Sequence, residues 1–179
     1  MSTEQNADQD NIDQIKCWNG DAGDKWVRFA DRLDALLAPF APLILERAAL
    51  QTGERVLDIG CGGGALSLAA EEKIAPDGGV TGVDVSAPLL ELARQRSANA
   101  GGNSAFVEAD AAQYRSSIPL DAAVSRFGVM FFSDPAVAFS SLRRSFRPEA
   151  RLVFVCWQGL GEVGHRRFER GAGPGVFRK

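Results

Sequence analysis

The apolar residues of this chain alternate between two patterns from about residue 55 onward. Short apolar runs are typical of buried strands, and they occur at residues 55–59, 80–85, 105–109, 120–125 and 152–156. Between these runs apolar residues recur every three or four positions, which predicts helices. We expect these helices over 65–73, from a cap at Ser86 to the glycines at 101–102, and from Asp134-Pro135 onward. The chain therefore has the pattern of an α/β domain.

The N-terminal part has a different pattern. Residues 1–15 are almost entirely polar, with little to bury, so we expect a disordered tail. Apolar residues spaced by three and four between residues 22 and 40 predict one helix, which Pro39 and Pro42 end. A second short helix should follow, carrying Leu43, Ile44 and Ala48.

Composition and charge narrow the classes of protein. With 179 residues, of which 45% are hydrophobic and 24% charged, the chain fits one soluble domain with a sizeable core. Its net charge of −3 favours neither nucleic acid nor a membrane surface as a partner. No stretch is apolar enough for a membrane span, and the odd number of widely spaced cysteines indicates a reducing compartment. We expect a cytoplasmic protein.

The most informative stretch is ERVLDIGCGGG, at residues 54–64, where an apolar strand ends in a glycine turn and a helix follows. Glycines let the backbone approach a ligand, and free N–H groups should point outward at the helix start. Gly60, Gly62 and Ala65 also match the spacing of a dinucleotide fingerprint, a weak signal alone. Asp58 changes this interpretation, because a carboxylate beside the turn is unfavourable for a pyrophosphate and favourable for an ammonium or sulfonium. The turn thus favours a cationic ligand.

Four motifs in order resemble those of the class I S-adenosylmethionine (SAM) dependent methyltransferases. The first is the acid followed by G-x-G-x-G, here Asp58, Gly60, Gly62 and Gly64. The others are GVDVS at 82–86, EADA at 108–111 and SRFGVMFF at 125–132. With Trp18-Asn19-Gly20, the chain looks most like the small-molecule branch that includes quinone-biosynthesis methyltransferases.

The resemblance implies a Rossmann-like, doubly wound, mostly parallel sheet in the order 3-2-1-4-5, with N-terminal helices and without the usual last two strands. It implies a SAM-binding domain over residues 16–157. The expected cofactor-binding residues are Asp58, Gly60, Cys61, Gly62 and Gly64 for the methionine portion, Asp84 for the ribose, Asp110 with Ala111 for the adenine, and Arg126, Phe127 and Trp18 at the methionine end. Val85 is expected to bind the cofactor as well.

Several of these positions have a second interpretation. Trp18 and Trp26 could pack the helical segment onto the sheet or belong to a lid over the pocket. Asp110 could be a plain helix cap. Met130, Phe131 and Phe132 could face the methyl acceptor or pack under the N-terminal helices.

Beyond Trp157 the resemblance ends. Residues 158–179 are rich in glycine and arginine, which suggests a truncated chain with a disordered tail, in which His165 is expected to be solvated. The alternative is that this tail folds through Val176 and Phe177 onto the sheet edge that the missing strands leave bare. An uncovered fifth strand would favour a homodimer through its edge. At residues 147–150, Glu149 and Ala150 stand where relatives usually have glycines, so we look for backbone strain there.

The sequence supports a SAM-dependent methyltransferase that acts on a small molecule. The alternative is a SAM-binding remnant or regulatory partner without transferase activity. A third hypothesis, an NAD(P)-binding protein, is supported only by the glycine spacing. No catalytic base can be named from the sequence, and no motif supports Tyr114 in that role. No metal is expected, because His and Cys clusters are absent.

Overall fold

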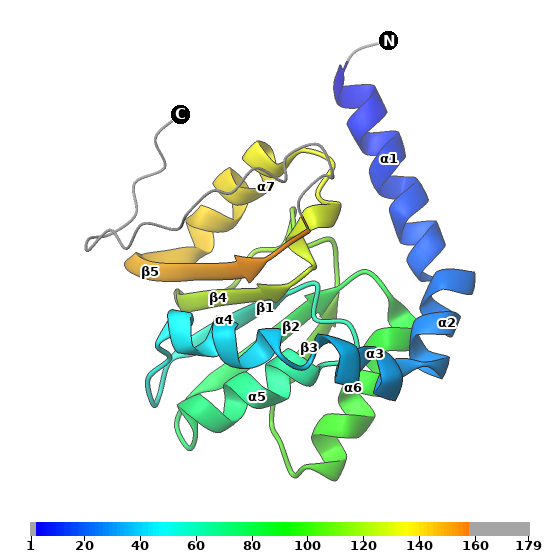
Figure 1. Ribbon diagram of the computed structural model, residues 1–179. Helices are drawn as coiled ribbons and strands as arrows, with labels where there is room; N and C mark the ends of the chain where they lie inside the picture. Colours follow the sequence, from blue (N-terminus) through cyan, green and yellow to red (C-terminus); the bar gives the residue numbers. More distant parts are fainter. Residues whose placement is uncertain (1–2, 158–179) are drawn as a thin grey trace, which may run out of the picture.

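The structure is a computed structural model that describes residues 3–157, without the side chains of residues 3–8 and 10 (Figure 1). Its strands form one sheet in the order β3-β2-β1-β4-β5, and every neighbouring pair is parallel. The strands are β1 (Arg55–Ile59), β2 (Gly79–Asp84), β3 (Ala105–Glu108), β4 (Leu120–Arg126) and β5 (Phe146–Val155). The predicted fold class and strand order are confirmed.

Helices cover both faces of this sheet. They are α1 (Thr3–Trp18), α2 (Asp21–Arg28), α3 (Ala30–Leu37), α4 (Phe40–Ala48), α5 (Ala65–Ile74), α6 (Ala87–Asn99) and α7 (Pro135–Leu142), with short 3₁₀ helices at Val129–Phe131 and Arg143–Ser145. Helices α4, α5 and α6 lie on one face and α7 on the other (Figure 1). The connections therefore change face between β1 and β4, which creates the switch point where doubly wound folds bind ligands. None of the described helices is long and apolar enough to cross a membrane.

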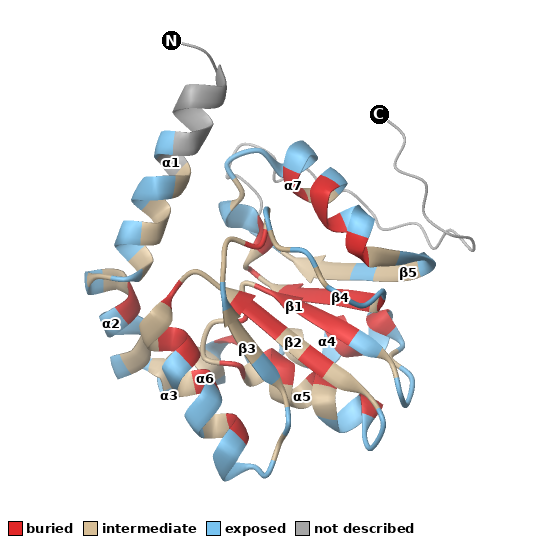
Figure 2. Cartoon of the chain, turned by 180° about the vertical axis from the view of Figure 1, so that it is seen from behind, coloured by how far each residue is buried: buried red, intermediate tan, exposed pale blue. Residues whose placement is uncertain are grey.

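Alternation along β1 divides the core between the two faces. Val56 packs with residues of α4 and α5, whereas Leu57 and Ile59 pack with residues of β4 and α7. Both sets are buried, and the buried residues follow the central strands (Figure 2). Asp58 shares the face of Val56, so its side chain points toward α5.

The prediction of a disordered tail over residues 1–15 differs from the structure, which has helix α1 there. Asn11, Ile15 and Trp18 recur at helical spacing and line one side of the helix that faces the domain. The Asn11 side chain donates a hydrogen bond of 3.0 Å to Asp110. These contacts join segments 99 residues apart, so local composition did not reveal them.

The single helix expected between residues 22 and 40 is two helices. Phe29, with φ −109° and ψ 16°, ends α2 and precedes α3. The hydrophobic spacing continues through the break, but α2 packs against α6 whereas α3 is tied to both α6 and β4. The direction of the helix therefore changes at Phe29 because of tertiary contacts, although the spacing of the hydrophobic residues does not change.

The turn predicted at 147–150 is part of β5. Leu120 pairs with Phe146 and Ala122 with Arg151, so the extra residues of β5 form an irregular bulge. The expected strain is absent there, because Ala49 and Phe127 are the non-glycine residues with positive φ in the described chain. β5 is an edge of the sheet, and the dimer through it stays a prediction. The predictions for residues 158–179, including His165, lie outside the described residues.

Candidate ligand-binding site

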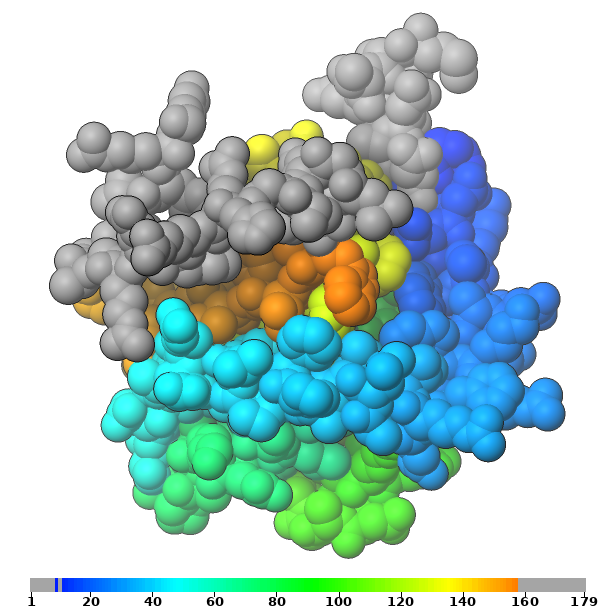
Figure 3. Space-filling model, viewed as in Figure 1, coloured from blue at the N-terminus to red at the C-terminus, as the bar shows by residue number. Residues whose placement is uncertain are grey.

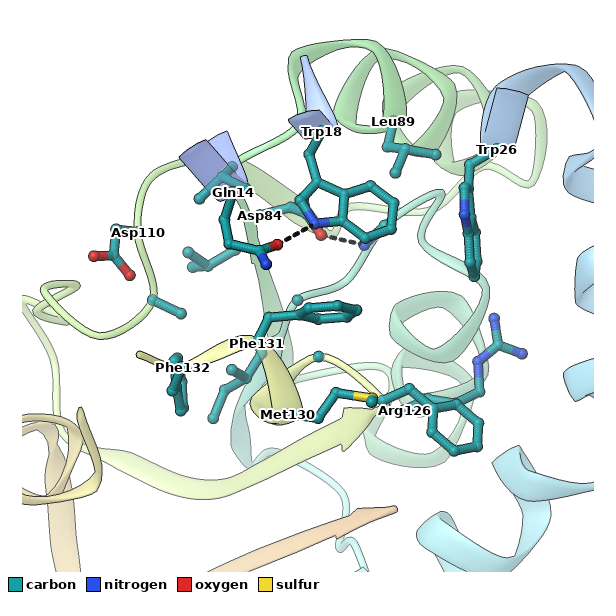
Figure 4. Close-up of a pocket in the computed structure, with 18 of the residues that line it drawn as sticks. Gln14, Trp18, Trp26, Asp84, Leu89, Asp110, Arg126, Met130, Phe131 and Phe132 are labelled. Carbon is teal, nitrogen blue, oxygen red and sulfur yellow. Dashed lines mark hydrogen bonds between the residues drawn. The ribbon is translucent and has the colours of Figure 1, made fainter. Parts of the chain in front are cut away.

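A cavity of about 400 Å³ lies at the carboxyl ends of the central strands, beneath helices α1, α2 and α3. This volume is within the range of ~300–1,000 Å³ that is usual for small-molecule sites. Of the twelve residues that the sequence singled out, nine line it: Trp18, Gly60, Gly62, Asp84, Val85, Asp110, Ala111, Arg126 and Phe127. Figure 4 shows Asp110 at one end and Arg126 at the other, with the rings of Trp18 and Phe131 between them.

The glycine turn forms the floor of the cavity. Gly60 and Gly62 have φ values of +66° and +52°, a conformation that favours glycine. A Cβ on Gly60 would lie 2.6 Å from the Cα of Gly128, so the loops after β1 and β4 can meet only without a side chain there. The N–H groups of Gly60 and Cys61 donate to the Val83 carbonyl, at 2.8 and 3.1 Å. These two hydrogen bonds hold the turn to β2. The free N–H groups expected at the start of α5 stay a prediction.

Asp84, at the end of β2, joins this turn to the cavity wall. Its carboxylate accepts hydrogen bonds from the N–H of Gly62 at 2.8 Å and of Ser86 at 2.9 Å. Burial raises the pKa of Asp84, against the lowering effect of these backbone hydrogen bonds. A carboxylate has about four acceptor positions. The two that these N–H groups leave free allow Asp84 to accept two more hydrogen bonds.

Asp110, which follows β3, lies at the far end of the same cavity. One carboxylate oxygen accepts from the N–H of Ala112 at 2.8 Å. The other accepts from the side chains of Asn11 at 3.0 Å and Gln113 at 3.2 Å. A turn and no helix follows Asp110, so the cap interpretation is wrong and the side chain instead anchors α1.

Asp58 does not line the large cavity. It is 1% exposed and accepts a hydrogen bond of 2.6 Å from the Ser67 hydroxyl in α5. Burial raises its pKa to about 7, although Ser67 and the Arg126 charge lower it. Strand alternation places the side chain under the glycine turn, on the face of α5. Asp58 also lines a smaller hollow of about 70 Å³ beside Gly60, and its contact with a ligand stays a prediction.

Cys61 and Gly64 also lie outside the large cavity. Cys61 is buried, and its sulfur would be 2.8 Å from a Cβ added to Gly82, so it packs the turn against β2. Gly64 has φ +79°, and a Cβ there would lie 2.9 Å from Ala93 Cβ in α6. Both residues shape the turn from beneath.

The loop after β4 closes the opposite end. Phe127 has φ +67° in a buried position, an uncommon conformation for a bulky residue. Its N–H donates to the Val155 carbonyl at 3.0 Å, and its ring stacks on Trp157 at 4.6 Å and meets Phe40 edge-on at 5.1 Å. The backbone hydrogen bond and these two ring contacts fix the position of Phe127 at this end of the cavity.

Aromatic rings form the middle of the cavity. Trp18 meets Trp26 edge-on at 5.7 Å and Phe131 at 5.4 Å (Figure 4). Met130 and Phe132 line the cavity too, and Phe132 packs on Phe139 of α7. Residues 130–132 were expected either to face the methyl acceptor or to pack under the N-terminal helices. In the structure all three line the cavity, and Phe131 also contacts α1. Trp18 and Trp26 are likewise cavity residues and not core.

Residues 18 and 19 hold the N-terminal helices to the site. The Asn19 side chain accepts from the N–H of Ala87 at 2.9 Å and donates to the Val85 carbonyl at 2.7 Å. Ser86 is the N-cap residue of α6, as expected, but its hydroxyl makes no cap hydrogen bond and donates to the Trp18 carbonyl at 2.7 Å. Asn19 therefore supplies the cap that Ser86 does not.

Sequence reasoning missed several lining residues. Asn11, Gln14 and Ile15 come from the segment expected to be disordered, and their spacing with Trp18 is the signal that could have found them. Leu33, Leu36 and Leu37 come from α3, and Leu89 from α6. Within residues 3–157 no group of three His, Cys, Asp or Glu residues is arranged to hold a metal ion.

The comparisons with known proteins agree with this arrangement. Residues 56–149, more than half of the chain, match the family described as "Methyltransferase domain". Over 137 residues the chain is 31% identical to an uncharacterized protein of Mycobacterium bovis, covering 76% of this chain and 49% of that protein. It is 34% identical over 135 residues to demethylmenaquinone methyltransferase of Thermus thermophilus, covering 70% of this chain and 59% of that enzyme.

A solved structure is similar as well. A SAM-dependent methyltransferase from Thiobacillus denitrificans, in complex with S-adenosyl-L-homocysteine, superimposes with a TM-score of 0.54 at 27% identity, covering 66% of this chain and 46% of that one. The chain thus spans about half the length of the curated relatives it matches. The family match, the strand order and the cavity at the switch point agree, and the chain belongs to the methyltransferase-domain family.

Proposed function

We propose that this chain binds SAM and serves a methyltransferase that acts on a small molecule. The observation that carries the proposal is the placement of Asp84 and Asp110 at the ends of neighbouring strands, both lining one cavity beside the glycine turn. Carboxylates at two such points suit the hydroxyl and amino donors of a nucleoside. The complex of the Thiobacillus enzyme with S-adenosyl-L-homocysteine supports this choice of cofactor.

The residues present fit this cofactor. Asp84, with two acceptor positions left, would receive the ribose hydroxyls, and Val85 follows it along the wall. Asp110 and Ala111 would hold the adenine, in which case the Asn11 amide shares or yields its place on Asp110. Gly60, Gly62, Arg126, Phe127 and Trp18 would surround the methionine portion.

Asp58, Cys61 and Gly64 take a supporting part in this proposal. They fix the turn from beneath, and Asp58 and Cys61 also line the smaller hollow beside Gly60. The glycine turn is thereby preorganised before any ligand arrives.

When bound, SAM supplies a methyl group on a sulfonium, which is an activated leaving group. The chain's own residues then contribute alignment and exclusion of water. The Trp18 and Phe131 rings suit a positive charge near their faces. The Arg126 charge would repel the sulfonium, but Asp34 neutralises it at 2.7 Å.

For the acceptor we propose an apolar small molecule. Trp26, Leu36, Met130 and Phe131 line the cavity without a charged group of their own. The demethylmenaquinone methyltransferase of Thermus thermophilus, by its name an enzyme for a quinone-type acceptor, supports the same class.

Calorimetric titration with S-adenosylhomocysteine tests the proposal, with NAD as the parallel control. We expect binding at micromolar or tighter, about −8 kcal/mol, and none of NAD. Asp84→Asn should weaken this binding, whereas Asp77→Asn, at an exposed turn far from the cavity, should not. Binding of NAD alone, or of neither ligand to folded protein, would refute the proposal. Binding without methyl transfer to any acceptor would instead favour a regulatory SAM-binding protein.

A further inference from the structure

Helix α3 covers the cavity but has little hydrophobic anchoring. Leu33, Leu36 and Leu37 form part of the cavity wall, yet Leu37 is the buried residue of this eight-residue helix and Leu36 is 71% exposed. Figure 3 shows α2, α3 and α4 as a band along the surface between β5 and the lower helices. Burial of apolar area alone therefore stabilises the position of α3 weakly.

Ion pairs made by Asp34 hold α3 in place. Asp34 accepts from Arg126, at the end of β4, at 2.7 Å and from Arg96, in α6, at 2.8 Å. Arg96 also donates to the carbonyl of Gly63 in the glycine turn, at 3.0 Å. A single carboxylate of α3 is thus connected to α6, to β4 and, through Arg96, to the turn.

The environment makes these pairs stronger than ordinary surface ion pairs. The side chains of Asp34 and Arg126 are 27% and 14% exposed, so water and salt screen them only in part. Charge-assisted hydrogen bonds of this length are stronger than neutral ones. Without the Asp34 charge, Arg126 would lose its partner at 2.7 Å and Arg96 its partner at 2.8 Å. The exposed Asp31 would stay 3.3 Å from Arg96, and the buried Asp58 would still interact with the Arg126 charge.

We propose that Asp34 is a positioning residue: it holds α3 over the cavity and fixes the Arg126 guanidinium at the glycine-turn end. Arg126 lines both the large cavity and a smaller hollow of about 70 Å³ beside Gly60. An unpaired Arg126 would be free to turn into the cavity. The effect on ligand affinity rests on the proposed function, whereas the effect on α3 does not.

Hydrogen exchange followed by mass spectrometry tests the anchoring role in the full chain. Asp34→Asn should raise amide exchange over residues 30–37 by about tenfold while leaving β1 exchange within twofold of the wild type. Asp31→Asn is the matched control, since it removes an exposed carboxylate of the same helix and should change neither segment by more than twofold. If Asp34→Asn does not fold, Arg96→Gln removes one of the two pairs and should raise exchange over the same segment.

Titration with S-adenosylhomocysteine measures the consequence for the site. Asp34→Asn should raise Kd by about three- to tenfold, Asp31→Asn should leave it unchanged, and Asp34→Glu, which keeps the charge, should restore most of the affinity. Unchanged exchange of α3, or equal rises in α3 and β1, would overturn the proposal, as would an Asp34→Glu variant no better than Asp34→Asn. If the wild-type chain does not bind the ligand, the proposed function fails, and the exchange experiment still decides the role of Asp34.

Discussion

The Asp58→Asn variant should gain stability relative to the wild-type protein as the pH rises. In the wild type a carboxyl group lies fully inside the domain, with the Ser67 hydroxyl as its hydrogen-bond donor. Burial disfavours its charged form and raises its pKa from 3.8 to about 7. Asparagine is nearly the same size, can still accept from Ser67 and has no proton to lose.

The sign and size follow from proton linkage. Between about pH 4 and pH 7 the folded protein holds a proton on Asp58 that the unfolded chain has released, so the free energy of unfolding falls as pH rises. The contribution is complete below pH 4 and lost above pH 7. A difference of about three pKa units corresponds to about 4 kcal/mol in all, of which about 2.5 kcal/mol falls between pH 5 and pH 8.

Urea unfolding of both proteins at pH 5, 6, 7 and 8 provides the measurement. We expect the stability of Asp58→Asn relative to wild type to increase by about 2.5 kcal/mol from pH 5 to pH 8. The raised pKa of Asp84 acts in the same direction but cancels, because both proteins contain it. Asp77→Asn, at an exposed turn, should give a curve parallel to the wild type. Parallel curves for Asp58→Asn would refute the reasoning, since they would mean that folded Asp58 is ionised at its ordinary pKa.

Three further changes test individual contacts. Asp84→Asn should weaken S-adenosylhomocysteine binding by about tenfold, because hydrogen bonds to a charged group are worth about 1.5–3 kcal/mol. An unchanged Kd in calorimetry would contradict this expectation. Ser125→Ala should lower the free energy of unfolding by about 1–3 kcal/mol, since the buried hydroxyl donates to the Ile59 carbonyl at 2.7 Å. A loss below about 0.5 kcal/mol in urea unfolding would argue against this role of Ser125. Asp134→Ala should cost about 1 kcal/mol, because the carboxylate caps α7 by accepting from the Val137 N–H at 2.9 Å; Asp134→Asn, which keeps an acceptor, should recover most of it in thermal unfolding.

Much of the fold could be predicted from local pattern. The five strands and the helix starts at Ala65 and Pro135 agree with the structure to within a few residues, except that β5 begins before its predicted range. The reason is that strand and helix periodicities, glycine turns and Asx caps are local signals. Asp84 could be singled out by its place at the end of a predicted strand, 24 residues after Gly60, whereas Asp110 was assigned from the resemblance to the SAM-dependent methyltransferases.

What the sequence determined by itself was the order of elements and the position of the turn, since these depend on residues close together in the chain. The tertiary structure decided which face of β1 carries Asp58, that residues 3–18 form a helix against Asp110, and that Asn19 takes over the cap of α6. It also decided that Asp34 meets Arg96 and Arg126, which are 62 and 92 residues away. Each of these contacts joins distant segments, so its stabilisation exists only once the sheet has brought them together.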